Sequence, residues 1–140
     1  MDGLKLLLRE HFANFALVDY EMFNPFDAFG KVMVKNFESK GIPLTSIGRF
    51  ATIQEIQHSY LQAGYDECLI QTMRELYYYK MSKSEIKRIS QLEWADEFEE
   101  FDLMQQHYFI SISKYSRDGL KEIKELSFDN LSDLNQETQK

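Results

Sequence analysis

The hydrophobic period of this chain changes inside one segment, Leu92–Ser113, and this change constrains the fold more than any other sequence feature. Phe98, Phe101 and Met104 recur at the spacing of one helix face, within a dense run of carboxylates. From Tyr108 the apolar residues alternate with a period of two, which is typical of a strand. We therefore predict an acidic helix that leads directly into a strand of a sheet.

The run of carboxylates on this helix comprises Glu93, Asp96, Glu97, Glu99, Glu100 and Asp102. We interpret it as a helix face, because it lacks the spacing of a calcium loop and has too many members to single out a general acid and base. His107 begins the following strand, and we expect its ring to form a structural hydrogen bond with a carboxylate. Asp96 and Glu97 are the expected partners of His107 or of the neighbouring backbone. The three histidines of the chain share no ligand spacing, so we predict no metal site.

Composition places the chain among globular proteins. Its 140 residues, 44% of them hydrophobic, suffice for one domain with a core. No apolar run approaches the roughly 20 residues that a membrane span needs, and Leu4–Leu8 is too short for a signal peptide. A single cysteine, Cys68, fits a reducing compartment, so we expect a cytoplasmic protein. The net charge of −7 argues against a general nucleic-acid surface, so any contact with RNA has to be local.

Helix and strand patterns alternate along the rest of the chain. We expect strands at 15–18, at 67–73 and from about 107, and helices at 4–10, from Asn24 to about 39, at 53–61 and at 82–92. Asn24 is the expected cap of the second helix, with Pro25 in its first turn. The segment Thr52–Glu55 has the form of a capping box. This order predicts an α/β fold of about three strands with flanking helices.

The strand at Phe15–Val18 is a continuous apolar run, which is typical of an interior strand covered on both faces. Three strands make a thin sheet for such a strand, so we expect the chain to be the back half of a larger domain. Tyr20 and Glu21 follow at the strand end and are the candidates for contact with a ligand, because ligands of open α/β sheets bind there. Tyr77–Tyr79 could stack on bases, but we expect these rings to lie in a core between two elements.

Four segments, in order and spacing, resemble the leucine carboxyl methyltransferase family of S-adenosylmethionine enzymes. They are Asp19–Glu21, NPFDAFGKVM at 24–33, RFATIQEIQHSYLQAGY at 49–65 and LEWADEFEEFDLMQQHYFI at 92–110. The resemblance covers about residues 12–115 and implies the C-terminal half of a Rossmann-like methyltransferase domain. We place this partial domain at 1–123 and expect a polar, disordered tail at 124–140.

The family has two main branches. One completes wybutosine beside the anticodon of phenylalanine tRNA, and the other methylates the C-terminal leucine of the protein phosphatase 2A catalytic subunit. The residues at 25–30, 42–44 and 96–100 resemble the tRNA branch, which we favour. Gly119–Ile123 resembles the ending of the phosphatase branch, which is the alternative.

The resemblance assigns few functional residues. The family's glycine-containing cofactor loop and its ribose-binding acidic residue lie upstream of the matched segments, so we expect most of the S-adenosylmethionine site to be missing from this chain. A non-catalytic truncated remnant is therefore a second alternative. Tyr20, Glu21 and Arg49 match family positions and are the substrate-pocket candidates, whereas catalytic and cofactor-binding residues stay unassigned.

Asp96, Glu97, His107 and Tyr108 also match recurring family positions, and we expect structural roles for them. The reaction that the family implies is transfer of a sulfonium methyl group to a carboxylate oxygen. Such a reaction depends on the positioning of two reactants rather than on a covalent enzyme intermediate.

Overall fold

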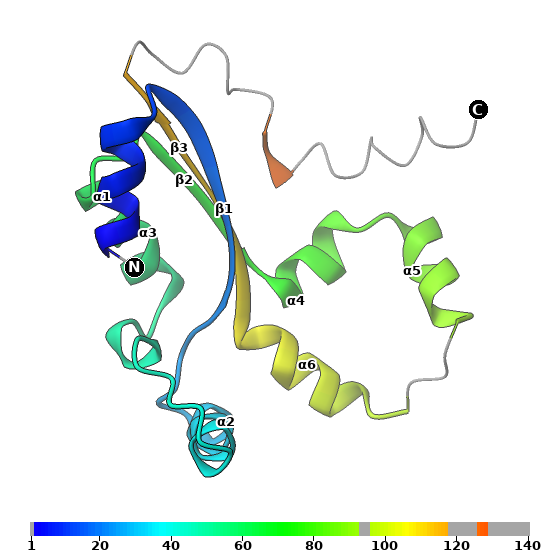
Figure 1. Ribbon diagram of the computed structural model, residues 1–140. Coiled ribbons are helices and arrows are strands. Elements are labelled where there is room, and N and C mark those ends of the chain that lie inside the picture. Colours follow the sequence, from blue (N-terminus) through cyan, green and yellow to red (C-terminus); the bar gives the residue numbers. More distant parts are fainter. Residues whose placement is uncertain (1, 93–95, 118–125, 129–140) are drawn as a thin grey trace.

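The computed structural model describes residues 2–92, 96–117 and 126–128, and its centre is a twisted sheet of three strands (Figure 1). The strands are β1 (Asn14–Met22), β2 (Glu67–Thr72) and β3 (Tyr108–Ser116), in the order β1-β3-β2. β3 is antiparallel to both neighbours, so that Val18 of β1 and Leu69 of β2 both lie opposite Ile112. The predicted α/β fold with three strands is confirmed, and it is consistent with a partial methyltransferase domain.

The prediction that Phe15–Val18 forms an interior strand refers to a larger domain and stays a prediction. Among the described strands β1 lies at an edge, and the Val18 side chain is 59% exposed. The interior strand is β3, which buries Phe109 on one face and Ile112 on the other. A continuous apolar run therefore marked a strand correctly, but the number of its covered faces depended on partners elsewhere in the chain.

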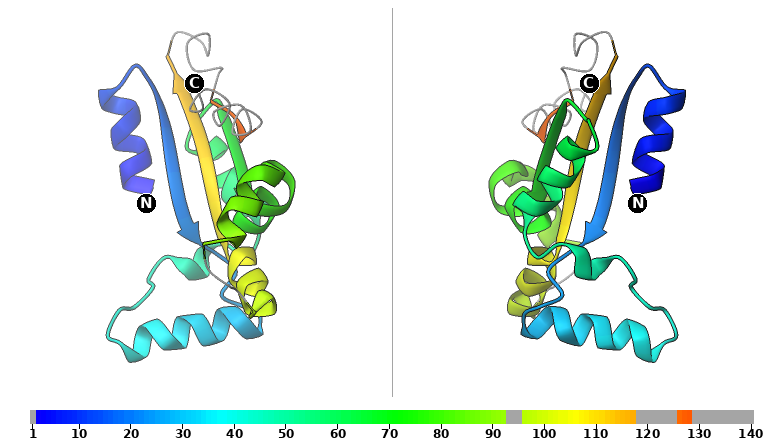
Figure 2. Two further views of the ribbon diagram at one scale, coloured as in Figure 1. Left: turned by 90° about the vertical axis from the view of Figure 1, so that its right-hand side faces the viewer. Right: turned by 90° about the vertical axis from the view of Figure 1, so that its left-hand side faces the viewer.

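The helices lie on both faces and at one end of the sheet. They are α1 (Asp2–His11), α2 (Ala28–Ser39), the short 3-10 helix η1 (Ile47–Arg49), α3 (Ile53–Gln62), α4 (Met73–Glu75), the π-helix η2 (Leu76–Lys80), α5 (Lys83–Ser90) and α6 (Phe98–Gln106). Figure 2 shows α1 and α3 in front of the sheet in one view, α4 to α6 on the opposite side, and α2 beyond the sheet end. Within the described part of the chain, no helix is long and apolar enough to cross a membrane.

Each face of β3 contributes to a separate hydrophobic cluster. Phe109 belongs to the cluster under α1 and α3, which contains Phe23, Ile56, Tyr60, Tyr65 and Cys68. The other cluster consists of Leu76, Ile112 and Phe128, and Ile110 packs against it. The period of two that the sequence predicts from Tyr108 is therefore the alternation that separates the two clusters. Within the expected tail at 124–140, the structure describes residues 126–128.

Two predicted helix starts have different outcomes. The capping box of α3 is confirmed, with the Glu55 backbone N–H 3.2 Å from Thr52 Oγ1 and the Thr52 N–H 3.1 Å from the Glu55 carboxylate. The prediction that Asn24 caps α2 is wrong, because the cap is Asp27, whose Oδ1 accepts from the Gly30 N–H at 2.7 Å. Asn24 instead turns the chain with φ of 54°. The loop before this helix contains two possible caps, Asn24 and Asp27. Because Asp27 is the one used, the helix begins at Ala28.

The acidic helix is shorter than its charge run. α6 begins at Phe98, so Asp96 and Glu97 precede it and are exposed, while Glu93 lies outside the described residues. Phe101 is half-buried, whereas the Phe98 side chain is 59% exposed. The predicted apolar face of this helix is therefore only partly covered by the described residues.

Candidate functional site

A cavity of about 390 Å³ lies where β1 leaves the sheet, and all three substrate-pocket candidates line it. Tyr20 and Glu21 contribute from the carboxyl end of β1, and Arg49 comes from η1. The antiparallel register places the start of β3 beside them, with Glu21 opposite Phe109. The fold thus brings together candidates from two segments that are distant in the sequence.

One wall of the cavity is a pair of stacked tyrosines. The rings of Tyr20 and Tyr108 are nearly parallel, at 17°, with centroids 5.3 Å apart. Burial, and to a smaller extent Tyr108, raise the pKa of the Tyr20 phenol above its ordinary value. Tyr20 is therefore a neutral hydrogen-bond donor at physiological pH.

Glu21 is the half-buried acidic group of the cavity. Side chains alternate along β1, so Glu21 shares its face with Asp19 and points away from the face of Tyr20. Burial raises the pKa of the Glu21 carboxyl first and the negative charge of Asp19 raises it further, while Lys5 partly offsets both. A cationic ligand group beside Glu21 would offset these effects and stabilise the ionised carboxylate.

A buried cation that the sequence analysis missed also lines the cavity. Lys5 of α1 is 3% exposed, and its Nζ lies 3.3 Å from the centroid of the Tyr60 ring and 3.2 Å from Ser59 Oγ. The Tyr60 hydroxyl in turn donates to the Asp19 carboxylate, and burial together with this bond raises the pKa of Tyr60 far above its ordinary value. The strand period could have placed Asp19 beside Glu21, but no local signal connects Lys5 with α3.

Arg49 supplies an exposed cation to the cavity wall. Its guanidinium carbon lies 5.5 Å from the centroid of the Phe50 ring, which also lines the cavity. A guanidinium beside apolar and aromatic side chains suits a carboxylate attached to an apolar group. The cavity therefore combines Arg49 for an anion, Glu21 for a cation and aromatic rings for apolar surface.

Cys68 is no candidate nucleophile, although it is the single cysteine of the chain. Its side chain is 3% exposed, and burial raises the pKa of the thiol above its ordinary value. An activated cysteine needs the opposite shift. Among residues 2–92, 96–117 and 126–128, no group of three or more side chains could hold a metal ion.

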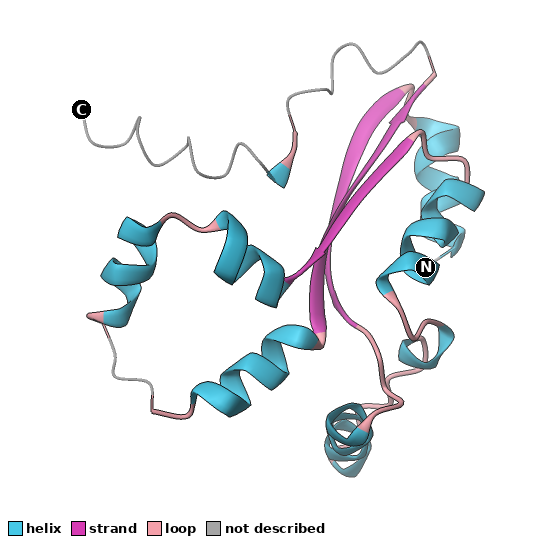
Figure 3. Ribbon diagram, turned by 180° about the vertical axis from the view of Figure 1, so that it is seen from behind, coloured by secondary structure: helices cyan, strands magenta, loops and turns pink. Residues whose placement is uncertain are grey.

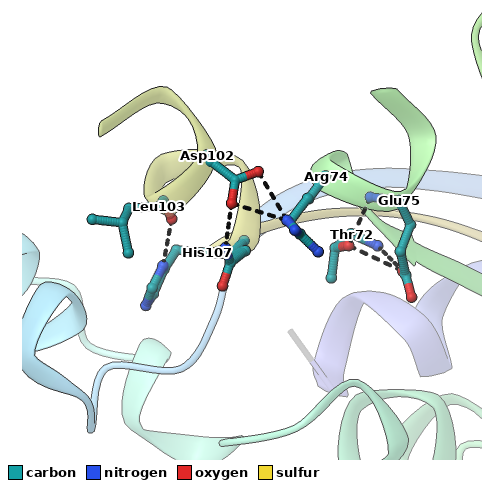
Figure 4. Close-up of polar contacts among 7 residues, drawn as sticks. Thr72, Arg74, Glu75, Asp102, Leu103 and His107 are labelled. Carbon is teal, nitrogen blue, oxygen red and sulfur yellow. Dashed lines mark hydrogen bonds and ion pairs between the residues drawn. The ribbon is translucent and has the colours of Figure 1, made fainter. Parts of the chain in front are cut away.

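His107 makes the structural hydrogen bond that we predict, but its partner is different. The ring is 2% exposed, its Nε2 lies 2.9 Å from Asp27 Oδ2 and its Nδ1 lies 2.7 Å from the Leu103 carbonyl oxygen (Figure 4 shows the Leu103 contact). The expectation that Asp96 or Glu97 binds His107 is wrong, because both precede α6 and are exposed. The pair joins the start of α2 to the residue before Tyr108, which lines the cavity.

Comparison with known proteins gives relatives for most of the chain, although no protein-family model matches it. It is 37% identical over 101 residues to tRNA wybutosine-synthesizing protein 4 of Homo sapiens, which covers 72% of this chain and 15% of that protein. It is 37% identical over 92 residues to a leucine carboxyl methyltransferase 1 homolog of Arabidopsis thaliana, covering 66% of this chain and 28% of the relative. Leucine carboxyl methyltransferase 1 of Yarrowia lipolytica is 34% identical over 103 residues, covering 74% and 32%. The chain thus spans less than a third of the length of each of these relatives.

Proposed function

This chain is homologous to part of the leucine carboxyl methyltransferases and of tRNA wybutosine-synthesizing protein 4, and we propose that it forms part of an S-adenosylmethionine-dependent carboxyl methyltransferase. The observation that carries the proposal is that Tyr20, Glu21 and Arg49 all line one cavity, with Tyr20 and Glu21 on opposite faces of β1. A methyl acceptor with an ionised carboxylate needs a cation to orient it and apolar walls that exclude water. The cavity offers both.

The residues present fit part of the cofactor. S-adenosylmethionine has positive charge at its sulfur and amino group, and Glu21 is a half-buried carboxylate whose ionised form a cation would stabilise. Asp19 is the other acidic residue on this strand face. It already accepts a hydrogen bond from the Tyr60 hydroxyl, so we do not assign it to the cofactor ribose. When bound, the cofactor would supply an electrophilic methyl group. Glu21 would hold its cationic side, and the remaining contacts fall to other parts of the enzyme.

The residues of this chain would act by orientation. Arg49 would bind the acceptor carboxylate, and the neutral Tyr20 hydroxyl would donate a second hydrogen bond to it. The acceptor carboxylate is ionised at neutral pH and therefore needs no general base. The cavity contains hydroxyl groups but has no need of an activated nucleophile, because the reaction joins two bound reactants directly.

For the acceptor, we propose the carboxyl group of a wybutosine precursor in phenylalanine tRNA. The human and rat wybutosine-synthesizing proteins support this choice, at 37% and 36% identity, together with the motifs at 25–30, 42–44 and 96–100. The alternative acceptor is the C-terminal leucine of the protein phosphatase 2A catalytic subunit. Relatives named leucine carboxyl methyltransferase 1 support the alternative, although Gly119–Ile123 lies outside the described residues.

The test uses the enzyme that contains this segment, with radiolabelled S-adenosylmethionine. Two acceptors are offered separately: phenylalanine tRNA that carries the unmethylated wybutosine precursor, and a peptide with the phosphatase C-terminus. We expect label in the tRNA. Label only in the peptide would assign the phosphatase reaction, and label in neither would favour the remnant. Calorimetry of this 140-residue chain with S-adenosylmethionine addresses the remnant further, since tight binding would overturn it.

A further inference from the structure

The segment Arg74–Ser90 has the opposite charge from the rest of the chain. Its basic residues are Arg74, Lys80, Lys83, Lys87 and Arg88, and its acidic residues are Glu75 and Glu85. The segment therefore has a net charge of +3, in a chain whose total is −7. It forms α4, η2 and α5, and Figures 1 and 3 show α5 at the outer end of this arm, away from the sheet.

The two acidic side chains of this arm are occupied by local hydrogen bonds. The Glu75 carboxylate accepts from the Thr72 backbone N–H at 2.9 Å, which caps α4 (Figure 4). The Glu85 carboxylate binds Arg88, with 2.6 Å between Oε1 and Nη2. Lys83 and Lys87 are exposed and one turn apart on α5, so they present two positive charges on the same side of this helix.

The tyrosines next to these lysines are not all in the core, contrary to our expectation. Tyr77 packs on Phe101 of α6, with ring centroids 5.3 Å apart, but Tyr78 is 48% exposed and Tyr79 is 74% exposed. Consecutive side chains of a helix point in different directions, so a single neighbour cannot cover three of them. The arm is held beside α6 by the ion pair of Arg74 and Asp102, at 2.8 Å (Figure 4).

We propose that Tyr79, Lys83 and Lys87 form a binding surface for single-stranded RNA, which we call the η2–α5 surface. Proteins bind such RNA by combining basic groups that contact the backbone with exposed aromatic rings on which bases stack. Lys83 follows Tyr79 by four positions, so their Cα atoms are at most about 14 Å apart and a few nucleotides reach both. The proposal rests on the tRNA substrate proposed above, and it places part of that RNA outside the methyl-transfer cavity.

The test measures binding of this 140-residue chain to a fluorescein-labelled single-stranded RNA of mixed sequence, by fluorescence anisotropy over a salt series. The test variant is Lys83→Glu with Lys87→Glu. The matched control is Lys31→Glu with Lys35→Glu, which changes the net charge equally and alters exposed lysines with the same spacing on α2. Far-UV circular dichroism of both variants verifies the fold.

We expect the α5 variant to bind at least about tenfold more weakly and to lower the slope of log affinity against log salt by about 1.4, while the α2 variant stays within about twofold. We expect Tyr79→Ala to weaken binding at least about fivefold and Tyr79→Phe to retain it. Equal losses in both lysine variants, or no binding of RNA by the parent chain, would overturn the proposal. Binding of a polyglutamate peptide that Tyr79→Ala leaves unchanged would also overturn it, and would indicate an acidic protein partner.

The same variants separate this proposal from the proposed function. In the whole enzyme, methyl transfer to tRNA that is insensitive to the α5 variant would overturn the η2–α5 surface and leave the tRNA reaction standing. RNA binding that depends on Lys83, Lys87 and Tyr79, without methyl transfer to tRNA, would support the surface and contradict the tRNA reaction.

Discussion

His107 and Asp27, 80 positions apart in the sequence, form a hydrogen bond between a buried ring and an exposed carboxylate, with 2.9 Å between Nε2 and Oδ2. The other ring nitrogen faces the Leu103 carbonyl oxygen at 2.7 Å. Both partners of the ring are oxygen acceptors. Asp27 also caps α2, so its carboxylate links the start of this helix to His107, the residue before β3.

Replacement of Asp27 by alanine should destabilise the fold by about 2 kcal/mol, because the helix cap is lost and a buried histidine loses a partner. Urea unfolding of the variant measures this. Asp96→Ala is the matched control, since Asp96 is exposed and precedes α6, and its cost should stay below about 0.5 kcal/mol. Equal effects of the two substitutions would contradict the assigned role of Asp27.

The contribution of Asp27 should depend on pH. Burial raises the pKa of its carboxyl, but hydrogen bonds from the Gly30 N–H and His107 outweigh this and hold the pKa below the ordinary 3.8. A carboxyl with a lowered pKa stabilises the fold above its unfolded pKa, and this stability is lost as the pH falls through its folded pKa. The difference in unfolding free energy between the parent and Asp27→Asn should thus be full at pH 6 and shrink below about pH 3.8. A difference that is constant with pH would refute this assignment.

Removal of the Tyr60 hydroxyl should cost about 1.5 to 3 kcal/mol, because it donates to an ionised partner, Asp19, in a half-buried site. Tyr65→Phe is the control, since the Tyr65 hydroxyl is also buried but lies 3.5 Å from its acceptor, the Lys5 carbonyl oxygen. Thermal and urea unfolding compare the two variants. A larger loss for Tyr65→Phe would show that the Asp19 bond is not the important one.

Arg49→Ala should lower kcat/KM of the whole enzyme for the carboxylate acceptor by about 10-fold to 150-fold, the equivalent of a hydrogen bond to a charged group. Arg49→Lys should recover part of this activity, because it keeps the charge without the planar fork. Arg117→Ala, an exposed arginine outside the cavity, should leave kcat/KM unchanged. An unaltered kcat/KM in Arg49→Ala would remove Arg49 from the substrate pocket.

Cys68 should resist alkylation while the chain is folded. Its thiol is buried and accepts a hydrogen bond from the Ser113 hydroxyl. Because burial also raises the pKa of the thiol, little of the nucleophilic thiolate forms at neutral pH. Iodoacetamide at pH 7.5 followed by mass spectrometry should show no adduct within minutes, and full modification after unfolding in urea. Rapid modification of the folded chain would contradict this burial.

Several features of the fold were determined by short stretches of sequence. The capping box of Thr52 and Glu55 and the change of period at Tyr108 both appear in the structure as predicted. Each depends on backbone hydrogen bonds or side-chain alternation within a few residues, so no distant partner is needed to specify it. The end of β1 was not identified in this way, because the predicted strand ends at Val18, whereas β1 continues to Met22 and includes Tyr20 and Glu21.

The tertiary structure decided which of these elements and side chains meet. It placed β3 between β1 and β2, paired His107 with Asp27 instead of Asp96 or Glu97, and added Lys5 to the cavity lining. It also left Tyr79 outside the core. Contacts of this kind join residues that are tens of positions apart, and they form only when burial and charge pairing over the whole chain are satisfied together. Local patterns therefore defined the elements, and the packing of those elements defined the site.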